Sequence, residues 1–197
     1  MRQEGDRALA IVLEQVRKSY GDQLVLDGIS RTIATGSCIA LMGPSGIGKT
    51  TLLSLLAGLQ SPDFGRITGL PKQRAMVFQE NRLIEHANAL TNLKLVCGAE
   101  YTREVLIEEL KKIGIEDVQK PIVEFSGGMK RRVAILRAVL AEAKLLLMDE
   151  PFLGLDAERK TQVMEYVKAH CAGKTVVLVT HEEEEAKALG AEIWYLK

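Results

Sequence analysis

A glycine-rich stretch that ends in a lysine and two threonines carries the clearest chemical signal in the sequence. In residues 43–51, GPSGIGKTT, four residues separate Gly43 from Gly48, Lys49 and Thr50. The run CIALM before this stretch predicts a buried strand, and the spacing of leucines after it predicts a helix. A strand, a glycine-rich turn and a helix in this order are what a phosphate-binding P-loop requires.

The residue types in this stretch suit a nucleotide with its magnesium ion. Glycines let backbone N–H groups surround phosphate oxygens without Cβ clashes, and the helix start adds positive potential. The Lys49 ammonium can reach the β- and γ-phosphates, and the Thr50 hydroxyl can ligate Mg²⁺. We therefore predict nucleotide contacts with Gly43, Pro44, Ser45, Gly46, Ile47, Gly48, Lys49, Thr50 and Thr51.

Two carboxylates end a second apolar run, KLLLMDE, at Asp149 and Glu150. In α/β sheets the carboxyl ends of buried strands face the crevice in which ligands bind. Asp149 could hold Mg²⁺ through water, and Glu150 could orient and deprotonate an attacking water. Alone, such a pair is as often a solvated strand end. Beside a P-loop it favours a site of metal-assisted hydrolysis.

Three polar residues become candidates for the nucleotide site only because the chain also contains a P-loop. Gln79 ends the run RAMVF and could sense the γ-phosphate or Mg²⁺, although a single glutamine there is usually surface. His181 ends the run TVVLVT and could reach the γ-phosphate, although a single histidine is more often structural. Tyr20 precedes a turn and could stack on a base, or could be a surface tyrosine beside a hairpin.

Residues 124–132, EFSGGMKRR, contain a second glycine-rich helix start. Ser126 is a good N-cap, but glycines at 127 and 128 in the first helical turn cost about 1 kcal/mol each relative to alanine. Either the glycines are incidental, or something must come close to bare backbone at this helix start.

Short apolar runs alternate with helical patterns, which predicts a parallel sheet covered by helices on both faces. The expected strands are residues 38–43, 74–79, 144–150, 175–180 and 191–197, and the expected helices are residues 48–59, 127–143, 157–173 and 182–190. An antiparallel pair is expected at residues 9–20 and 26–34.

The block from about 80 to 135 lacks strand patterns, and residues 89–99 and 103–114 within it are helical in pattern. We therefore predict one α/β domain over residues 1–197. Its core and β-subdomain take up about 1–79 and 136–197, and a helical lobe takes up about 80–135.

Composition limits the classes of partner and compartment. The chain has 197 residues, with 26 Lys+Arg against 26 Asp+Glu, so the charge balance gives no hint of a nucleic-acid partner. Cys38, Cys97 and Cys171 are widely spaced, which argues against a disulfide framework or zinc site. The first ten residues lack the apolar core of a signal peptide, and no apolar run approaches membrane-spanning length. We expect a cytoplasmic protein.

Taken together, the motifs resemble the ATP-binding cassette (ABC) family over nearly the whole chain. They are Tyr20, GPSGIGKTT, Gln79, FSGGMKRR, LLLMDEP, Gly154-Leu155-Asp156 and His181. The resemblance implies a P-loop NTPase fold with a RecA-like core, an antiparallel β-subdomain and a helical lobe. It also implies an ATPase that uses ATP and Mg²⁺ and forms a head-to-tail homodimer around two ATP molecules.

The resemblance also implies roles for individual residues. Catalysis would involve Glu150, His181, Gln79 and Lys49, and the metal would be held by Thr50, Gln79 and Asp149. Asp156 and Tyr20 would join the P-loop in contacting nucleotide. Ser126, Gly127 and Gly128 would bind the γ-phosphate of ATP held by the other subunit, which would explain the bare helix start.

Departures from the family pattern are few. The family usually has Gln at the position of Met129, and often Ser at those of Ile47 and Thr50, but Thr50 keeps the hydroxyl. At the other two positions backbone should matter more than side chain, so activity is expected, and the sequence leaves open whether Ile47 and Met129 alter turnover. The chain stops shortly after the strand that follows His181, so we expect no regulatory C-terminal domain.

The resemblance implies a separate membrane permease as partner, with an extracytoplasmic solute-binding protein and attachment to the inner face of the membrane. The segment after Gln79 is similar to that of importers of the nitrate, sulfonate and taurine type, although Glu85-His86-Ala87 departs from it. Leu83, Ile84 and Leu90 could line the docking groove or belong to the lobe core. The alternatives are an ABC ATPase acting on nucleic acid or ribosomes, and a plain P-loop kinase, which would not need the second glycine-rich helix start.

Overall fold

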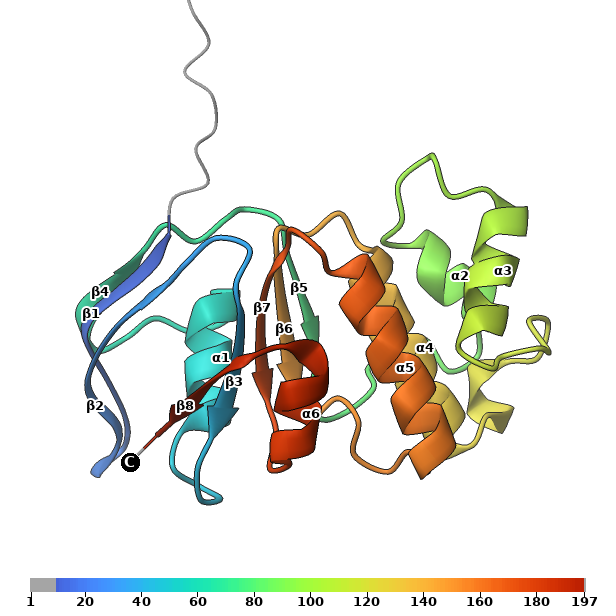
Figure 1. Cartoon of the computed structure of the whole chain (residues 1–197). Coiled ribbons are helices and arrows are strands. Elements are labelled where there is room, and N and C mark those ends of the chain that lie inside the picture. The colour runs from blue at the N-terminus through green and yellow to red at the C-terminus, as the bar shows by residue number, and fades with distance from the viewer. Residues whose placement is uncertain (1–9, 197) are drawn as a thin grey trace, which may run out of the picture.

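The computed structural model describes residues 10–196 and contains two sheets with helices around them (Figure 1). The larger sheet has five parallel strands in the order β5-β6-β7-β3-β8. These strands are β3 (Cys38–Met42), β5 (Arg74–Val77), β6 (Leu145–Asp149), β7 (Thr175–Val179) and β8 (Glu192–Tyr195). The predicted parallel sheet is confirmed, although the expected last strand extended to Lys197, which lies outside the described residues.

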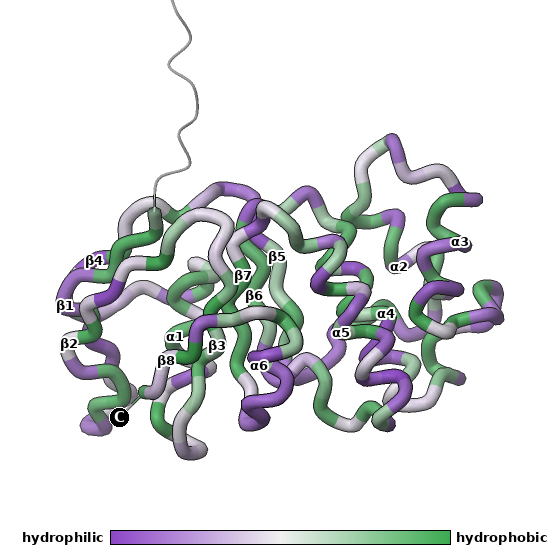
Figure 2. The backbone as a smooth tube through the Cα atoms, in the orientation of Figure 1, coloured by the Kyte–Doolittle hydropathy of each residue, from purple (hydrophilic) through white to green (hydrophobic). Residues whose placement is uncertain are grey.

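Helices cover both faces of this sheet, as the alternation of patterns predicted. Leu145 and Leu147 of β6 belong to the hydrophobic core around α1 (Lys49–Ala57). Their neighbours Leu146 and Met148 belong to the other core, with α4 (Gly127–Leu140), α5 (Ala157–His170) and α6 (Glu183–Leu189). Because successive side chains of a strand point to opposite faces, this run must be apolar throughout (Figure 2).

The smaller sheet is antiparallel, in the order β2-β1-β4. β1 (Ile11–Tyr20) and β2 (Gln23–Ile33) form the predicted pair, although the expected first strand began at Leu9, outside the described residues. β4 (Phe64–Thr68) was not predicted. Four of its five residues are exposed and the other is half-buried, so the strand carries no apolar alternation by which it could be recognised.

The helical lobe contains α2 (Ala89–Lys94), α3 (Arg103–Lys112) and a short 3-10 helix, η1 (Ile122–Glu124), all packed near α4. Figure 1 shows α2 and α3 beyond α4 and α5, far from the antiparallel sheet. The predicted helix at 89–99 is shorter than expected. Of the three candidate docking residues, Leu90 is buried in the lobe core, Leu83 packs against it, and Ile84 is 48% exposed.

A polar cluster joins the lobe to the core. The Tyr166 hydroxyl on α5 donates to the Glu109 carboxylate on α3, and Lys112 Nζ donates to the same carboxylate at 2.7 Å. The Tyr166 ring stacks on His170 with centroids 3.9 Å apart. Burial alone would raise the pKa of Glu109, but these two hydrogen bonds outweigh it and hold that pKa below its ordinary value.

The three cysteines are free, and burial raises the pKa of Cys38, Cys97 and Cys171 to about 11 in each case. Cys38 and Cys97 are half-buried and Cys171 is buried. Within residues 10–196, none of the helices combines the length and apolar character needed to cross a bilayer.

Candidate functional site

The P-loop lies between β3 and α1, and its own backbone requires glycine. Gly48 caps α1 with φ 103°, and a Cβ there would lie 2.7 Å from Leu26 Cδ2. Gly46 has φ 79° but open space around it. Gly48 is therefore required both by its backbone conformation and by its neighbours. Gly46 is required by its backbone conformation alone, and the space beside it is open.

Lys49 points back across this loop. Its side chain is buried, at 6% exposure, and Nζ donates to the carbonyl oxygens of Gly43 and Pro44, both at 2.8 Å. A buried ammonium held by two loop carbonyls is close to where the loop would hold phosphate. The contact of Lys49 with phosphate stays a prediction.

A hydrogen bond joins the side chains of Asp149 and Thr50. Asp149, at the end of β6, is 3% exposed, and burial raises the pKa of its carboxyl, while a hydrogen bond from Thr50 opposes that rise. A carboxylate and a hydroxyl are the hard oxygen ligands that Mg²⁺ prefers. The described residues contain no cluster of three His, Cys, Asp or Glu residues suited to a metal. Asp149 and Thr50 could hold a magnesium ion together with water and phosphate oxygens, and this contact stays a prediction.

Glu150 and His181 come together from neighbouring strands, β6 and β7. The Glu150 carboxylate oxygen lies 3.1 Å from His181 Nε2, with side-chain exposures of 21% and 50%. Glu150 has φ 46°, a left-handed conformation that a non-glycine residue adopts only when its surroundings hold it there. A carboxylate beside an imidazole at a partly open sheet edge can accept a proton from water.

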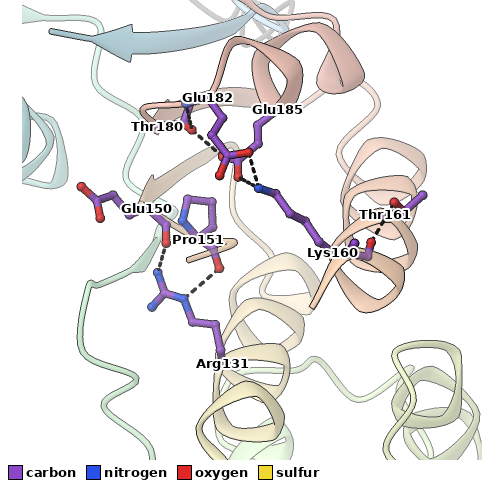
Figure 3. A network of polar contacts seen from close by, with 9 residues as sticks. Arg131, Glu150, Pro151, Lys160, Thr161, Thr180, Glu182 and Glu185 are labelled. Carbon is purple, nitrogen blue, oxygen red and sulfur yellow. Dashed lines mark hydrogen bonds and ion pairs between the residues drawn. The ribbon is translucent and has the colours of Figure 1, made fainter. Parts of the chain in front are cut away.

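Polar contacts, some buried and some exposed, hold the segment that carries His181, as Figure 3 shows. Lys160 Nζ on α5 lies 2.6 Å from Glu182 and 2.5 Å from Glu185, and the Thr180 hydroxyl donates to Glu185. Burial alone would lower the pKa of Lys160, but the two carboxylates outweigh it and raise that pKa. The residues on either side of His181 are therefore tied to α5.

Gln79 lies beyond the end of β5 and is exposed. It borders a pocket of about 240 Å³ that is also lined by Asn81, Gly127, Gly128, Arg131, Glu150, Leu153 and Gly154. The structure thus brings Gln79 near Glu150. Residues 43–51 of the P-loop do not line this pocket.

The second glycine-rich helix start is exposed and is not enclosed by its own chain. Ser126 caps α4, and its hydroxyl oxygen accepts from the Met129 N–H at 3.2 Å. A Cβ on Gly127 would meet nothing within 4 Å, and one on Gly128 would be in ordinary contact with Leu155 at 3.6 Å. Neither glycine has a positive φ.

Two further predicted contacts have local partners. Asp156 caps α5 and accepts from the Arg159 N–H at 3.0 Å. Tyr20 ends β1 at 47% exposure, and its hydroxyl donates to Gln60 at 2.6 Å. The contacts of Asp156 and Tyr20 with nucleotide stay predictions.

Sequence reasoning missed Arg131, which lies among these residues. It is 5% exposed and hydrogen-bonds to the backbone beside both Gln79 and Glu150. Lysines and arginines in succession usually mark a solvated helix face, so the run MKRR gave no signal for a buried guanidinium.

Comparison with known proteins defines the class. The family model described as "ABC transporter" matches residues 26–153. The aliphatic sulfonates import ATP-binding protein SsuB 3 of Rhodococcus jostii (strain RHA1) is 42% identical over 95% of this chain and 71% of that protein. The Nod factor export ATP-binding protein I of Rhizobium sp. (strain N33) is 38% identical over 92% of this chain and 66% of that protein.

Among solved structures, a dimer of the ATP-binding cassette MJ0796 in a post-hydrolysis state bound to ADP and Pi aligns with a TM-score of 0.82. The identity is 30%, and the match covers 95% of this chain and 94% of that one. The chain therefore belongs to the ABC transporter family. It is an ATP-binding subunit of this family and hydrolyses ATP, and the predicted fold class and the predicted likeness to sulfonate-type importer ATPases are confirmed.

Proposed function

We propose that this chain works as a head-to-tail homodimer that drives a separate membrane permease for import of a small organic anion of the sulfonate class. The observation that carries the proposal is the open start of α4, where a Cβ added to Gly127 would have no neighbour within 4 Å. Helix starts of this kind bind anions. The P-loop supplies phosphate contacts from one subunit, and Ser126, Gly127 and Gly128 supply them from the other.

The proposed chemistry follows from the geometry of the core. Lys49 and the loop amides bind the phosphates, and Thr50 and Asp149 would hold Mg²⁺, which neutralises developing phosphate charge when bound. Glu150 takes the proton of the attacking water. His181 Nε2, 3.1 Å from a Glu150 carboxylate oxygen, would hold that carboxylate in place and would contact the γ-phosphate.

The solute class and the permease partner come from the relatives. The higher identity, 42%, is to a sulfonate import protein, which supports import over export. The exposed Ile84 in the segment after Gln79 offers an apolar contact for a permease. Association through that permease would place the chain at the inner face of the membrane, with a solute-binding protein on the other side.

Mixed dimers test the shared site. A Lys49→Ala subunit and a Ser126→Arg subunit are each defective alone, but paired they join one intact P-loop to one intact α4 start. Adding Glu150→Gln to both stops hydrolysis, so ATP should be trapped in the closed complex. We expect about one trapped ATP per heterodimer, from one complete set of γ-phosphate contacts.

Differently tagged subunits allow heterodimers to be isolated and their bound nucleotide to be counted. If Ser126 were only a local N-cap, arginine there would cost about 0.5–2 kcal/mol of stability. Mixing would then rescue no trapping. Heterodimers that hold no more ATP than either defective homodimer would refute the shared site.

A further inference from the structure

Arg131 lies in the second turn of α4 and is among the few buried charged side chains of the described residues. Its Nη1 donates to the carbonyl oxygens of Phe78 and Gln79, the second at 3.2 Å. These carbonyls belong to the segment that leaves β5. One half of the guanidinium thus holds the backbone that carries Gln79.

The other half of the same guanidinium holds the end of β6, as Figure 3 shows. Nη2 donates to the carbonyl oxygens of Asp149 at 2.7 Å and Glu150 at 2.6 Å, and Nε donates to that of Pro151 at 2.8 Å. Three successive carbonyls therefore converge on one side chain. The guanidinium also donates to the Asn81 side-chain oxygen at 3.5 Å, and the charges of Asp149 and Glu150 favour its protonated form against the cost of burial.

These bonds surround the residue with the unusual backbone. Glu150 has φ 46°, and conformations of this kind persist only where the neighbouring structure fixes them. The carbonyls on both sides of Glu150, and its own, are held by Arg131. This arrangement determines the direction in which the Glu150 carboxylate leaves the strand end.

We propose that Arg131 is a positioning residue that holds Glu150 and the Gln79 segment in one catalytic arrangement through their backbone carbonyls. The inference rests on the proposed function, in which Glu150 is the general base. Arg131 is five residues beyond Ser126 on α4, so any movement of this helix would act directly on the backbone of both Gln79 and Glu150.

The geometry requires arginine in particular. A guanidinium carries five N–H donors in a rigid plane, whereas a lysine ammonium is a point charge with three donors. Lysine at this position would keep the charge but could not bond to both backbone segments at once. The Arg131→Lys variant therefore separates charge from geometry.

The adjacent Arg132 offers a matched control on the same helix. It is buried to a similar extent; its Nη1 donates to the carbonyls of Ile113 and Gly114 in the lobe and its Nε to that of Gly128, one turn earlier on α4, and none of these bonds reaches the Gln79 or Glu150 backbone. We expect Arg131→Lys to lower kcat for ATP hydrolysis by about 10- to 100-fold, because small misplacements of reacting groups are costly. KM for ATP should change less than about threefold, since the P-loop is untouched. Arg132→Lys should lower thermal stability comparably while leaving kcat within about threefold of wild type.

A double variant shows whether Arg131 acts through Glu150. If it does, adding Arg131→Lys to Glu150→Gln should reduce the residual hydrolysis no further. A wild-type kcat in Arg131→Lys, a loss equal to that of Arg132→Lys, or additive losses in the double variant would each overturn the proposal. Normal hydrolysis by Glu150→Gln alone would instead overturn the role of Glu150 in the proposed function.

Folding is checked first, by thermal unfolding and gel filtration. If Arg131→Lys does not fold, Arg131→Gln, which is neutral and keeps two donors, takes its place with the same expectations. If neither folds, Arg131 has no role separable from the fold, and the proposal is overturned.

Discussion

Two glycine-rich helix starts, those of α1 and α4, look alike in sequence and differ in what requires them. At α1, Gly48 has φ 103° and lies against Leu26, so the chain itself leaves no room for a side chain. At α4, Gly127 has an ordinary helical backbone and empty space around it. At the start of α1, glycine is thus required by contacts within the chain itself. The glycines of the second helix start are required by neither backbone conformation nor neighbours in the described residues, which supports the proposed contact with a partner's phosphate.

The largest effect is expected at the P-loop, which precedes α1. Lys49→Ala should weaken ATP binding by about 100-fold, because it removes a charge-assisted contact to the β- and γ-phosphates. Equilibrium titration with a labelled ATP analogue measures it, with thermal unfolding as the check on folding. Wild-type affinity in the variant would contradict the P-loop assignment and, with it, the comparison of the two helix starts.

Alanine at Gly48 should cost about 2–4 kcal/mol of unfolding free energy, from backbone strain and the contact with Leu26. Gly46→Ala is the control, since its φ is positive but its surroundings are open, so only strain remains. Denaturant unfolding of both variants measures the difference. Equal losses would mean that close packing at Gly48 is unimportant.

Alanine at Gly127 should act in the opposite direction on stability. Helix propensity favours alanine, so the free energy of unfolding should rise by about 0.5–1 kcal/mol. Steady-state ATP turnover should nevertheless fall about tenfold, because a methyl group would stand between the helix start and the partner's phosphate. A variant that is both more stable and fully active would show that nothing approaches this backbone.

The smallest expected effect concerns the charge of the buried Asp149 carboxylate. Because burial raises the pKa of Asp149, its ionised form costs stability; this cost is complete above the raised pKa and is lost as the pH falls from there to the ordinary pKa. Asp149→Asn should therefore raise the melting temperature at pH 7 by about 1–4 °C. It should also abolish magnesium-dependent hydrolysis.

The gain in melting temperature should narrow as the pH approaches the ordinary pKa of aspartate, near 3.8. Melting curves of both proteins across this range, without nucleotide, test the sign. A gain that does not change with pH would point to packing and not to charge.

Much of this arrangement follows from patterns that are local in the sequence. The P-loop, the β6 run and the cap at Ser126 are predictable because strand periodicity and helix capping depend on neighbouring residues. The pairing of Glu150 with His181 needs only the rule that parallel strands end at one edge. The predicted limits of the lobe, about 80–135, stay a prediction.

What could not be predicted depends on contacts between distant segments. The burial of Arg131 follows from carbonyls that come from residues 78–79 and 149–151, and nothing near Arg131 in sequence announces them. β4 is a strand because β1 pairs with it, not because of its own pattern. Leu90 and Ile84 are both aliphatic and lie six positions apart, yet Leu90 is buried and Ile84 is exposed. The difference arises from the packing of α2 on α4, which the sequence around them does not reveal.

The raised pKa values of the three cysteines have a practical consequence for conjugation chemistry. At a pKa of about 11, the thiolate fraction at neutral pH is roughly 100-fold below that of an ordinary thiol. A cysteine introduced at the exposed Glu124, just ahead of α4, should therefore react with a maleimide dye well before the native thiols. Fluorescence from that position could follow the approach of a second subunit in the otherwise unaltered chain.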